Sequence, residues 1–328
     1  MKKILSIFVA AVMAAGMFTA CSTSTEENVE ASGRLQIVTT IFPEYDWVMN
    51  VLGDTAGNAD VTMLLDSGVD LHSFQPTADD IMKIATCDMF IYVGGESDEW
   101  VEDALSEAVN PDMVVINLLD VLGDSVMEEE LVEGMEGEEE EEEGEEEEGP
   151  EYDEHVWLSL RNAAVLTQCI ADQLCVIDPA NTDAYTANAA SYIEELNELD
   201  AEYSSAVEEA DVNTLLFGDR FPFRYMTEDY GLDYYAAFVG CSAETEASFE
   251  TIMFLAGKVD ELGLNTVLTI EGTNHRIAET VVENTASSDQ QILSLDSMQS
   301  VTAEDVANGA SYIEIMRSNL DILRQALQ

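Results

Sequence analysis

Residues 178–211 read DPANTDAYTANAASYIEELNELDAEYSSAVEEAD, and this stretch decides the fold because it separates two alternating series of strands and helices. Asp178 is a candidate N-cap, and Pro179 suits the first helical position. Apolar residues then recur at helical spacing over about thirty residues, which at 1.5 Å per residue would span about 45 Å. One small domain does not need so long a helix. We therefore predict that residues 178–210 form a rigid connector between two lobes.

The chain before this helix, residues 34–177, alternates short apolar segments with amphipathic ones. The apolar segments are LQIVTTI, ADVTMLL, MFIYVGG and MVVINLL, and PEYDWVMNVLG, PTADDIMKIATC and DEWVEDALSEA lie between them. Short strands rich in Val, Ile and Met that alternate with amphipathic helices are typical of a parallel sheet covered by helices. An N-terminal α/β lobe is predicted here.

Residues 211–328 repeat the same alternation. The strand-like segments are NTLLFGD, LDYYAAFVG, NTVLTIEG and QILSLDSM, and a helix closes the chain. The predicted fold class is therefore α/β, with two parallel-sheet lobes joined by one long rigid helix. Ligands of open α/β sheets bind beyond the carboxyl ends of the strands, so we expect the site in the cleft between the lobes.

The N-terminus has the features of a secretion signal. Lys2 and Lys3 precede an apolar run that is too short for a comfortable membrane span, so residues 1–20 are predicted to be a signal peptide. The ending FTAC resembles a bacterial lipobox, which would place a lipid on Cys21 and anchor an extracytoplasmic protein to the bacterial cell membrane. The polar residues 21–33 are predicted to be a tether. An N-terminal helix buried in the fold is the alternative.

The chain is strongly acidic, with 11 basic and 68 acidic residues and a formal net charge of −57. This charge excludes nucleic acid as a natural partner and favours cations. Residues 123–152 lack hydrophobic periodicity and hold two long glutamate blocks, so we predict a disordered insert. The insert has two interpretations. It is either a solvated loop only, or a set of weak oxygen ligands that raises the cation concentration beside His155.

Two of the three histidines lie where a cleft ligand is expected. His72 follows a strand and precedes a helix that opens at Pro76, which puts its side chain at the carboxyl end of that strand. His155 directly precedes the apolar segment VWL, where the chain re-enters the lobe. His275 lies in a loop near a helix start and is interpreted as a solvent-facing residue. The first two are therefore candidate metal ligands.

The cysteines give no thiolate cluster by their spacing. No C-x-x-C pair occurs among the four that follow Cys21, so a metal cluster built from thiolates is not expected. Cys169 and Cys175 are interpreted as small buried residues of a helix. A disulfide in an exported protein is the open alternative. The four are Cys87, Cys169, Cys175 and Cys241.

Four segments together resemble the metal-binding lipoproteins that feed zinc or manganese to bacterial ABC importers, the zinc-uptake type of solute-binding protein. They are IVTTIFPEYDWVMNVLGD, LLDSGVDLHSFQPTADDI, DEHVWLSL and the long helical stretch quoted above. The similarity extends from about Leu35 to the end of the chain. It implies two α/β lobes joined by one rigid helix, His72 and His155 as ligands from the first lobe, and a membrane permease as partner.

The resemblance also implies ligands from the second lobe. ILSLDSMQS is similar to the family segment whose carboxylate closes the site, so Asp296 is the expected third ligand. The remaining family ligand falls on Arg220, but a guanidinium cannot bind a metal cation. Asp219 is therefore expected as the fourth ligand. Glu244 and Glu271 are reserve ligands. Glu271 is expected instead to orient a ligand imidazole, and Arg220 to pair with one of these acids.

The expected cargo is Zn²⁺, with Mn²⁺ as the alternative. Imidazole nitrogen suits zinc, whereas added carboxylates move a site toward manganese. A closed site of four nitrogen and oxygen ligands fits a tetrahedral ion, which favours zinc. The protein is expected to be a monomer and not an enzyme.

Two other classes of function remain as alternatives. A secreted metallohydrolase with a His and carboxylate zinc site would need an open coordination position and a general base. The sequence holds neither H-E-x-x-H nor G-x-S-x-G. The other class is a surface protein that uses its acidic coat for calcium buffering or cell adhesion. The calcium loop D-x-[DN]-x-[DN]-G is also missing from the sequence.

Overall fold

The computed structural model describes residues 33–137, 151–242, 246–272 and 274–328. Arg34–Gln328 form one compact unit. The predicted signal peptide, Cys21 and most of the tether lie outside the described residues, as do Glu244 and residues 138–150 of the predicted insert. In the part of the chain that is described, no helix is both long enough and apolar enough to cross a membrane.

The first lobe is built on a four-stranded parallel sheet with the order β2-β1-β3-β4. Its third strand, MFIY, is almost wholly buried, as expected for a parallel sheet covered on both faces. Thr77 and Asp80 form a capping box that starts α2. The strands are β1 (Leu35–Thr39), β2 (Ala59–Met63), β3 (Met89–Tyr92) and β4 (Val114–Asn117), and the helices are α1 (Phe42–Leu52), α2 (Ala78–Thr86), α3 (Trp100–Ser106), α4 (Leu118–Leu122) and α5 (Leu160–Ile177).

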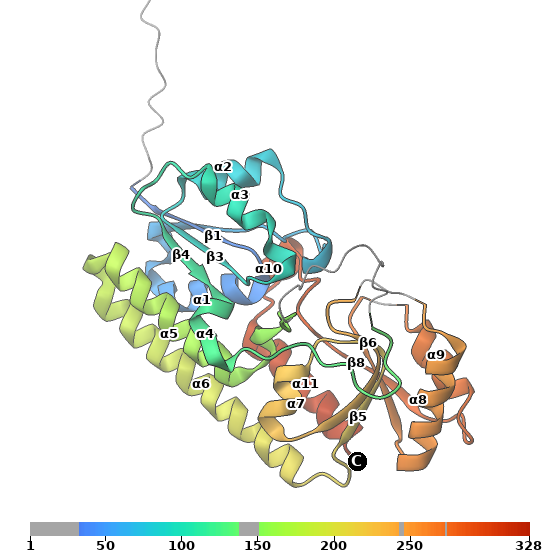
Figure 1. Ribbon diagram of the computed structural model, residues 1–328. Helices are drawn as coiled ribbons and strands as arrows, with labels where there is room; N and C mark the ends of the chain where they lie inside the picture. Colours follow the sequence, from blue (N-terminus) through green and yellow to red (C-terminus); the bar gives the residue numbers. More distant parts are fainter. Residues whose placement is uncertain (1–32, 138–150, 243–245, 273) are drawn as a thin grey trace, which may run out of the picture. The chain divides into compact units, whose positions relative to one another are not determined.

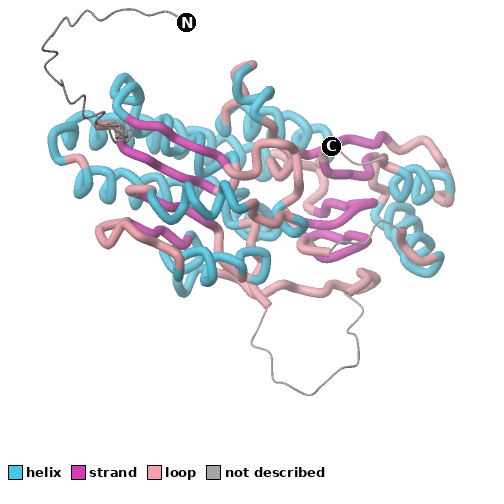
Figure 2. The backbone as a smooth tube through the Cα atoms, turned by 90° about the horizontal axis from the view of Figure 1, so that it is seen from above, coloured by secondary structure: helices cyan, strands magenta, loops and turns pink. Residues whose placement is uncertain are grey.

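The second lobe repeats this design with a parallel sheet of order β6-β5-β7-β8, and Figure 2 shows the two sheets as separate sets of strands. The pairing of β5 with β6 shifts register between Phe217 and Arg220. The strands are β5 (Thr214–Phe221), β6 (Asp233–Val239), β7 (Thr266–Ile270) and β8 (Gln291–Leu295), and the helices are α7 (Arg224–Tyr230), α8 (Phe249–Leu262), α9 (Arg276–Glu283), α10 (Ala303–Ala307) and α11 (Tyr312–Ala326).

The long helix between the lobes is α6 (Thr182–Glu208), which runs beside α5 in Figure 1. It begins later than predicted, because Pro179–Asn181 form a 3-10 turn, and Asp178 accepts hydrogen bonds from Asn181 and the Tyr185 hydroxyl instead of capping α6. Its buried residues are spaced alternately four and three apart, which gives one continuous apolar stripe. They are Tyr185, Ala189, Tyr192, Leu196, Leu199 and Tyr203.

One hydrophobic core extends through both lobes. Trp157, from the first lobe, donates its indole N–H to the Ser297 carbonyl at 2.8 Å, and the Tyr312 hydroxyl donates to the Trp157 carbonyl at 2.6 Å. The Tyr312 ring also meets Trp47 of α1 edge-on, with the ring centroids 5.4 Å apart. Because buried aromatic rings of both lobes share these contacts, the two sheets form one packed body.

The beginning of the predicted insert differs from the prediction. Residues 126–137, here called the acidic strap, leave the first lobe and pack against the second. The Glu136 N–H donates to the Ala237 carbonyl of β6, and the Glu136 carboxylate accepts from the Ser248 N–H at the start of α8. Met135 is buried. The prediction of disorder was wrong for this part, because the few apolar side chains among the glutamates find partners on the second lobe.

The base of the insert is closed by backbone pairing. The Glu129 N–H donates to the Glu151 carbonyl and the Asp153 N–H to the Met127 carbonyl, both at 2.9 Å, and Glu128 pairs antiparallel with Tyr152. This two-stranded clasp lies immediately before His155 in the chain. It therefore fixes the backbone that carries the second candidate ligand.

Candidate metal centre

His72 lies in a short 3-10 turn, Leu71–Ser73, between β2 and α2. The Asp70 carboxylate caps this turn by accepting from the His72 N–H at 3.1 Å. On the imidazole, Nδ1 lies 2.7 Å from the Ser97 hydroxyl and 3.5 Å from a Glu154 carboxylate oxygen. The Nδ1 side of the ring therefore contacts first-lobe residues, and Nε2 points away from these residues.

His155 is completely buried at the end of the clasp. One oxygen of Asp153 accepts from the His155 N–H at 2.9 Å and lies 3.0 Å from its ring Nδ1. A carboxylate on Nδ1 holds the proton there and leaves the lone pair on Nε2, which is the arrangement found in metal-binding histidines. Asp153 therefore holds this imidazole in the orientation that a metal ligand would need.

The two Nε2 atoms of His72 and His155 face each other at 3.2 Å. Two imidazoles bound to one tetrahedral zinc ion at 2.0–2.1 Å would have their nitrogens about 3.3 Å apart. Burial and then the neighbouring His155 lower the pKa of His72 to about 3, so its ring is neutral at pH 7. Burial opposes protonation of His155 as well, but Asp153 outweighs it and raises the pKa of that ring.

Cys241, a residue of the second lobe, lies close to the two histidines. Its Sγ and the ligand nitrogens of His72 and His155 all lie within 4.8 Å of one another. It belongs to the loop after β6, and its N–H donates to a Glu129 oxygen of the acidic strap at 3.1 Å. Cys241 was not among the predicted ligands because it has no cysteine close to it in the sequence. Its position after a strand of the second sheet was the signal that could have found it.

Gly240 lets the second lobe approach His155 closely. A Cβ at this position would lie 3.0 Å from the His155 Cε1 and 2.9 Å from the Phe221 carbonyl oxygen. These distances are shorter than ordinary van der Waals contacts, so any side chain here would push β6 and the histidine apart. The residue before Cys241 is therefore small for a steric reason.

The second-lobe carboxylates predicted as ligands are not members of the three-residue group that the described chain brings together. Asp296 directly follows β8, and its Oδ1 accepts from the Met298 N–H at 2.8 Å. Burial and then Glu271 raise the pKa of Asp296 to about 6. Asp219 accepts from the Arg220 N–H through Oδ1 and from the Ile270 N–H through Oδ2. Its carboxylate thus bridges backbone groups of β5 and β7.

Two further predicted residues have defined partners. Arg220 forms an ion pair with Asp70 of the first lobe, and its guanidinium also donates to the Ser242 carbonyl at 3.4 Å. Glu271 accepts from the Ser297 N–H and hydroxyl, both at 2.7 Å, and thereby fixes the loop that follows Asp296. His275 directly precedes α9 and has a left-handed backbone with φ of 54°.

A cavity of about 240 Å³ is lined in part by His72 and Cys241. Glu154 at its wall is buried, and this burial raises its pKa to about 7. Four glutamates line the cavity, which makes it an acidic route for a cation to the nitrogen and sulfur atoms. The lining residues are His72, Glu96, Ser97, Glu129, Glu151, Tyr152, Glu154 and Cys241.

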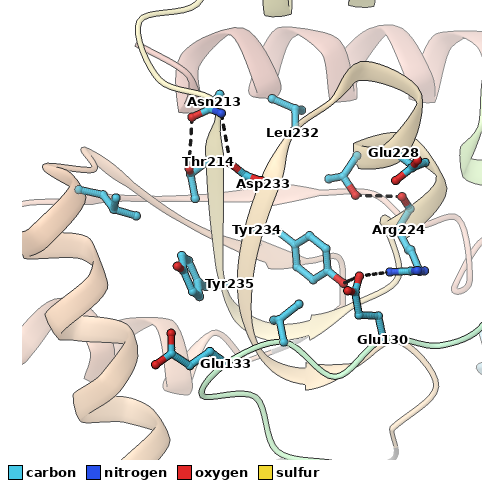
Figure 3. A pocket seen from close by; sticks show the side chains of 13 residues that line it. Glu130, Glu133, Asn213, Thr214, Arg224, Glu228, Leu232, Asp233, Tyr234 and Tyr235 are labelled. Atoms are coloured by element: carbon cyan, nitrogen blue, oxygen red, sulfur yellow. Dashed lines mark hydrogen bonds and ion pairs between the residues drawn. The ribbon is translucent and has the colours of Figure 1, made fainter.

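A separate hollow of about 670 Å³ lies on the second lobe beside the acidic strap (Figure 3). An ion pair between Arg224 and Glu130 crosses its wall, with the Tyr234 hydroxyl close to the same carboxylate. None of its described lining residues is a histidine or a cysteine. The hollow therefore lacks the donors that a transition metal prefers, and the histidine pair is the better candidate site.

Two parallel-sheet lobes joined by one long helix, with facing imidazoles at the strand ends, are typical of the solute-binding proteins that carry metal ions. The chain belongs to the ZnuA family, described as zinc-uptake complex component A, periplasmic, whose model matches residues 37–326. Its relatives include the zinc-binding lipoprotein AdcA of Streptococcus pneumoniae (strain ATCC BAA-255 / R6), 31% identical over 325 residues, which cover 99% of this chain and 61% of that protein.

Another relative is the high-affinity zinc uptake system protein ZnuA of Bacillus subtilis (strain 168), 29% identical over 95% of this chain and 94% of that protein. The chain thus spans about three fifths of the streptococcal AdcA proteins, 59% of those from Streptococcus pyogenes, but nearly all of the Bacillus protein.

Solved structures agree with the fold. The Zn(II)-bound ZnuA-like domain of Streptococcus pneumoniae AdcA has a TM-score of 0.69 and 29% identity, covering 90% of this chain and 99% of that domain. The metal-dependent lipoprotein YcdH of Bacillus subtilis has a TM-score of 0.72 and 26% identity, covering 90% of this chain and 100% of that one. The predicted α/β fold of two lobes and a long helix is confirmed.

Proposed function

We propose that this protein captures Zn²⁺ outside the cytoplasm and delivers it to the permease of an ABC importer, with Mn²⁺ as the alternative cargo. The observation that carries the proposal is the 3.2 Å separation of the Nε2 atoms of His72 and His155. Imidazole nitrogen is a preferred zinc ligand, and this separation suits one tetrahedral ion. The names of the relatives, which describe zinc binding and zinc uptake, support the same cargo.

In this proposal the second lobe adds a carboxylate to the two imidazoles. Asp296 is our choice because it lies at the carboxyl end of β8 and, among the described residues, its carboxylate accepts only from the Met298 N–H, through Oδ1. Asp219 is the further candidate, but its two oxygens each accept from a backbone N–H, which a metal bond would have to replace. A hydrogen bond lost in this way costs about 1–3 kcal/mol.

Release to a permease requires the second lobe to move slightly. The contacts that Trp157 and Tyr312 make across the shared core limit this movement to a small adjustment. A small shift of the loop around Asp296 would remove one ligand and leave the histidine pair intact. Such a loss of one oxygen ligand weakens binding without unfolding either lobe.

We also propose that a lipid on Cys21 holds the protein at the outer surface of the cell membrane and that it acts as a monomer. The basis for the lipid is the sequence FTAC, together with the word lipoprotein in the name of the pneumococcal relative. A globomycin-sensitive shift in mass of the exported protein, removed by Cys21→Ala, is the expected result. Exported protein of unchanged mass would contradict the anchor.

A carrier role is favoured over a metallohydrolase by the surroundings of the histidines. His155 is completely buried, and the cavity at His72 and Cys241 is only about 240 Å³, which suits an ion better than an ester or peptide substrate. We expect no turnover of esters or peptides by the zinc-loaded protein. Metal-dependent hydrolysis that disappears with His72→Ala would support the enzyme instead.

The metal itself is tested by analysis of protein purified without added ions, followed by competition between Zn²⁺ and Mn²⁺. One tightly held zinc ion for each chain, which excess manganese does not displace, is the expected result. If neither ion binds tightly to the purified chain, the proposed function is wrong.

A further inference from the structure

The thiol of Cys241 lies beside the paired imidazoles in an arrangement that suits a ligand. Its Sγ and the ring nitrogens of His72 and His155 lie within 4.8 Å of one another. A tetrahedral zinc ion with Zn–N of 2.0–2.1 Å and Zn–S of 2.3 Å would place nitrogen and sulfur about 3.5 Å apart. The nitrogen pair already has the spacing that such an ion needs, so only a small movement of the thiol is required.

The structure holds Cys241 in this position through two independent contacts. Its N–H donates to the Glu129 carboxylate of the acidic strap at 3.1 Å. The preceding Gly240 lies directly against the His155 ring, which leaves no space for a side chain between them. The cysteine also lines the acidic cavity together with His72, so an ion that enters this cavity meets both the thiol and the imidazole.

A basic side chain of the second lobe lies next to the cysteine segment but cannot act as a ligand. Arg220, also from the second lobe, forms an ion pair with Asp70 and reaches the Ser242 carbonyl next to the cysteine. Its guanidinium has no lone pair to give to a metal, so it cannot complete the coordination of the histidine pair. Cys241, one residue before Ser242, is the donor that the second lobe supplies beside this arginine.

We propose that Cys241 is a ligand of the transported ion and makes the site selective for zinc over manganese. This inference rests on the proposed function, since it concerns the same cargo. On binding, the S–H bond breaks, its proton passes to solvent, and the sulfur forms a bond to the metal. Thiolate is a soft ligand that zinc accepts readily and manganese does not, so the added sulfur stabilises the zinc complex selectively.

The test uses Co²⁺ as a spectroscopic substitute for zinc in the full chain. Thiolate bound to Co²⁺ gives an intense charge-transfer absorption in the near ultraviolet, which nitrogen and oxygen ligands do not give. We expect this band in the wild type and in Cys169→Ala, a matched control because Cys169 is half-buried on α5 outside the metal-ligand group. The band should be lost in Cys241→Ala and in Cys241→Ser, although Co²⁺ still binds.

Competition titrations measure the effect on selectivity. Cys241→Ala should lower the affinity for Zn²⁺ by roughly tenfold or more and that for Mn²⁺ by much less. If the wild type binds Co²⁺ without the charge-transfer band, or the variant keeps its zinc affinity, Cys241 is not a ligand. Circular dichroism confirms folding, and the Cys241→Ser variant, which keeps the size of the side chain, repeats the test should Cys241→Ala not fold.

His72→Ala separates this inference from the proposed function. If this variant loses tight zinc binding while both Cys241 variants keep it, the carrier function stands and only the thiolate ligand is rejected. If His72→Ala and the wild type bind zinc equally, the histidine site itself is wrong, and the role of Cys241 is rejected with it.

Discussion

The Nε2 atoms of His72 and His155 lie 3.2 Å apart although 83 residues separate them in the chain. Each ring is held from its Nδ1 side, His72 by Ser97 and His155 by Asp153. First-lobe groups thus hold the Nδ1 side of both rings, which means that half of the expected coordination is formed before a second-lobe ligand contributes.

Replacing His72 by alanine should abolish tight zinc binding, with a loss of at least about 100-fold in affinity, because one imidazole cannot hold the ion alone. Isothermal titration calorimetry of the metal-free protein measures this loss. The thermal midpoint without metal should change little, since His72 lies in a short turn at the edge of the lobe. His275→Ala is the matched control, and equal losses in both variants would contradict the assignment.

Asp153→Ala should weaken zinc binding by about 10–100-fold, because the His155 ring loses the carboxylate that fixes its tautomer and orientation. Asp153→Asn keeps an oxygen acceptor at the same place and should restore part of the affinity. Zinc titration against a chelator of known affinity gives the three values. An Asn variant weaker than the Ala variant would argue against an orienting role.

Asp296→Asn and Asp219→Asn distinguish the two proposed carboxylate ligands. The first should lower zinc affinity and speed the release of the ion, because an amide oxygen is a weaker ligand than a carboxylate. The second should have the smaller effect on affinity, since Asp219 accepts from the backbone of Arg220 and Ile270. Stopped-flow release into a chelator measures both. The opposite ranking would make Asp219 the ligand.

Gly240→Ala should disturb the centre although it replaces none of the proposed ligands. The new methyl group would meet the His155 ring at 3.0 Å and the Phe221 carbonyl at 2.9 Å, so β6 must shift. Overpacking of this kind costs about 1–3 kcal/mol, measurable as a lower free energy of unfolding in urea. Zinc affinity should fall with it. Gly257→Ala on α8, where a Cβ meets nothing within 4 Å, is the control.

Glu44 predicts a pH dependence of stability. Burial, then Asp98, raise the pKa of this fully buried carboxyl to about 8 from 4.5. Its protonated form is favoured in the folded state, so this contribution to stability is complete below pH 4.5 and is lost as the pH rises toward about 8, by at most about 1.4 kcal/mol per pH unit.

Urea unfolding of the metal-free protein between pH 4.5 and 8 checks this prediction. Glu44→Gln stays neutral and keeps an oxygen for the N–H of Thr40, so its stability should fall less steeply than that of the wild type. Glu195→Gln, at an exposed position of α6, should follow the wild type. Parallel curves for wild type and Glu44→Gln would show that Glu44 does not titrate in this range.

The fold was predictable because its signals are local and periodic. Alternating strands and helices indicate parallel sheets, and the long apolar stripe of α6 indicates the connector. That His72 and His155 lie together was predictable for a related reason, since the carboxyl ends of parallel strands gather at one edge. His72 follows β2 directly, and the clasp brings His155 to the same place.

The remaining features depend on contacts between distant segments that no local pattern records. The sequence of the acidic strap is typical of a charged loop. In the structure, however, Met135 is buried and the Glu136 carboxylate accepts a hydrogen bond at the start of α8. Cys241 carries no cysteine partner in its sequence neighbourhood and reaches the histidines only through folding. Arg220 pairs with Asp70, 150 residues away in the first lobe.

The clasp has a consequence for how this protein can change over time. Glu129 pairs with Glu151 and Met127 pairs with Asp153. These pairs fix the backbone next to His155 independently of the glutamate blocks. Each doubling of an intervening loop costs only about 0.6 kcal/mol of closure entropy. Mutations can therefore change the length or composition of the chain after Gly137 with little effect on stability. A reporter peptide can be inserted there while the orientation of Asp153 is preserved.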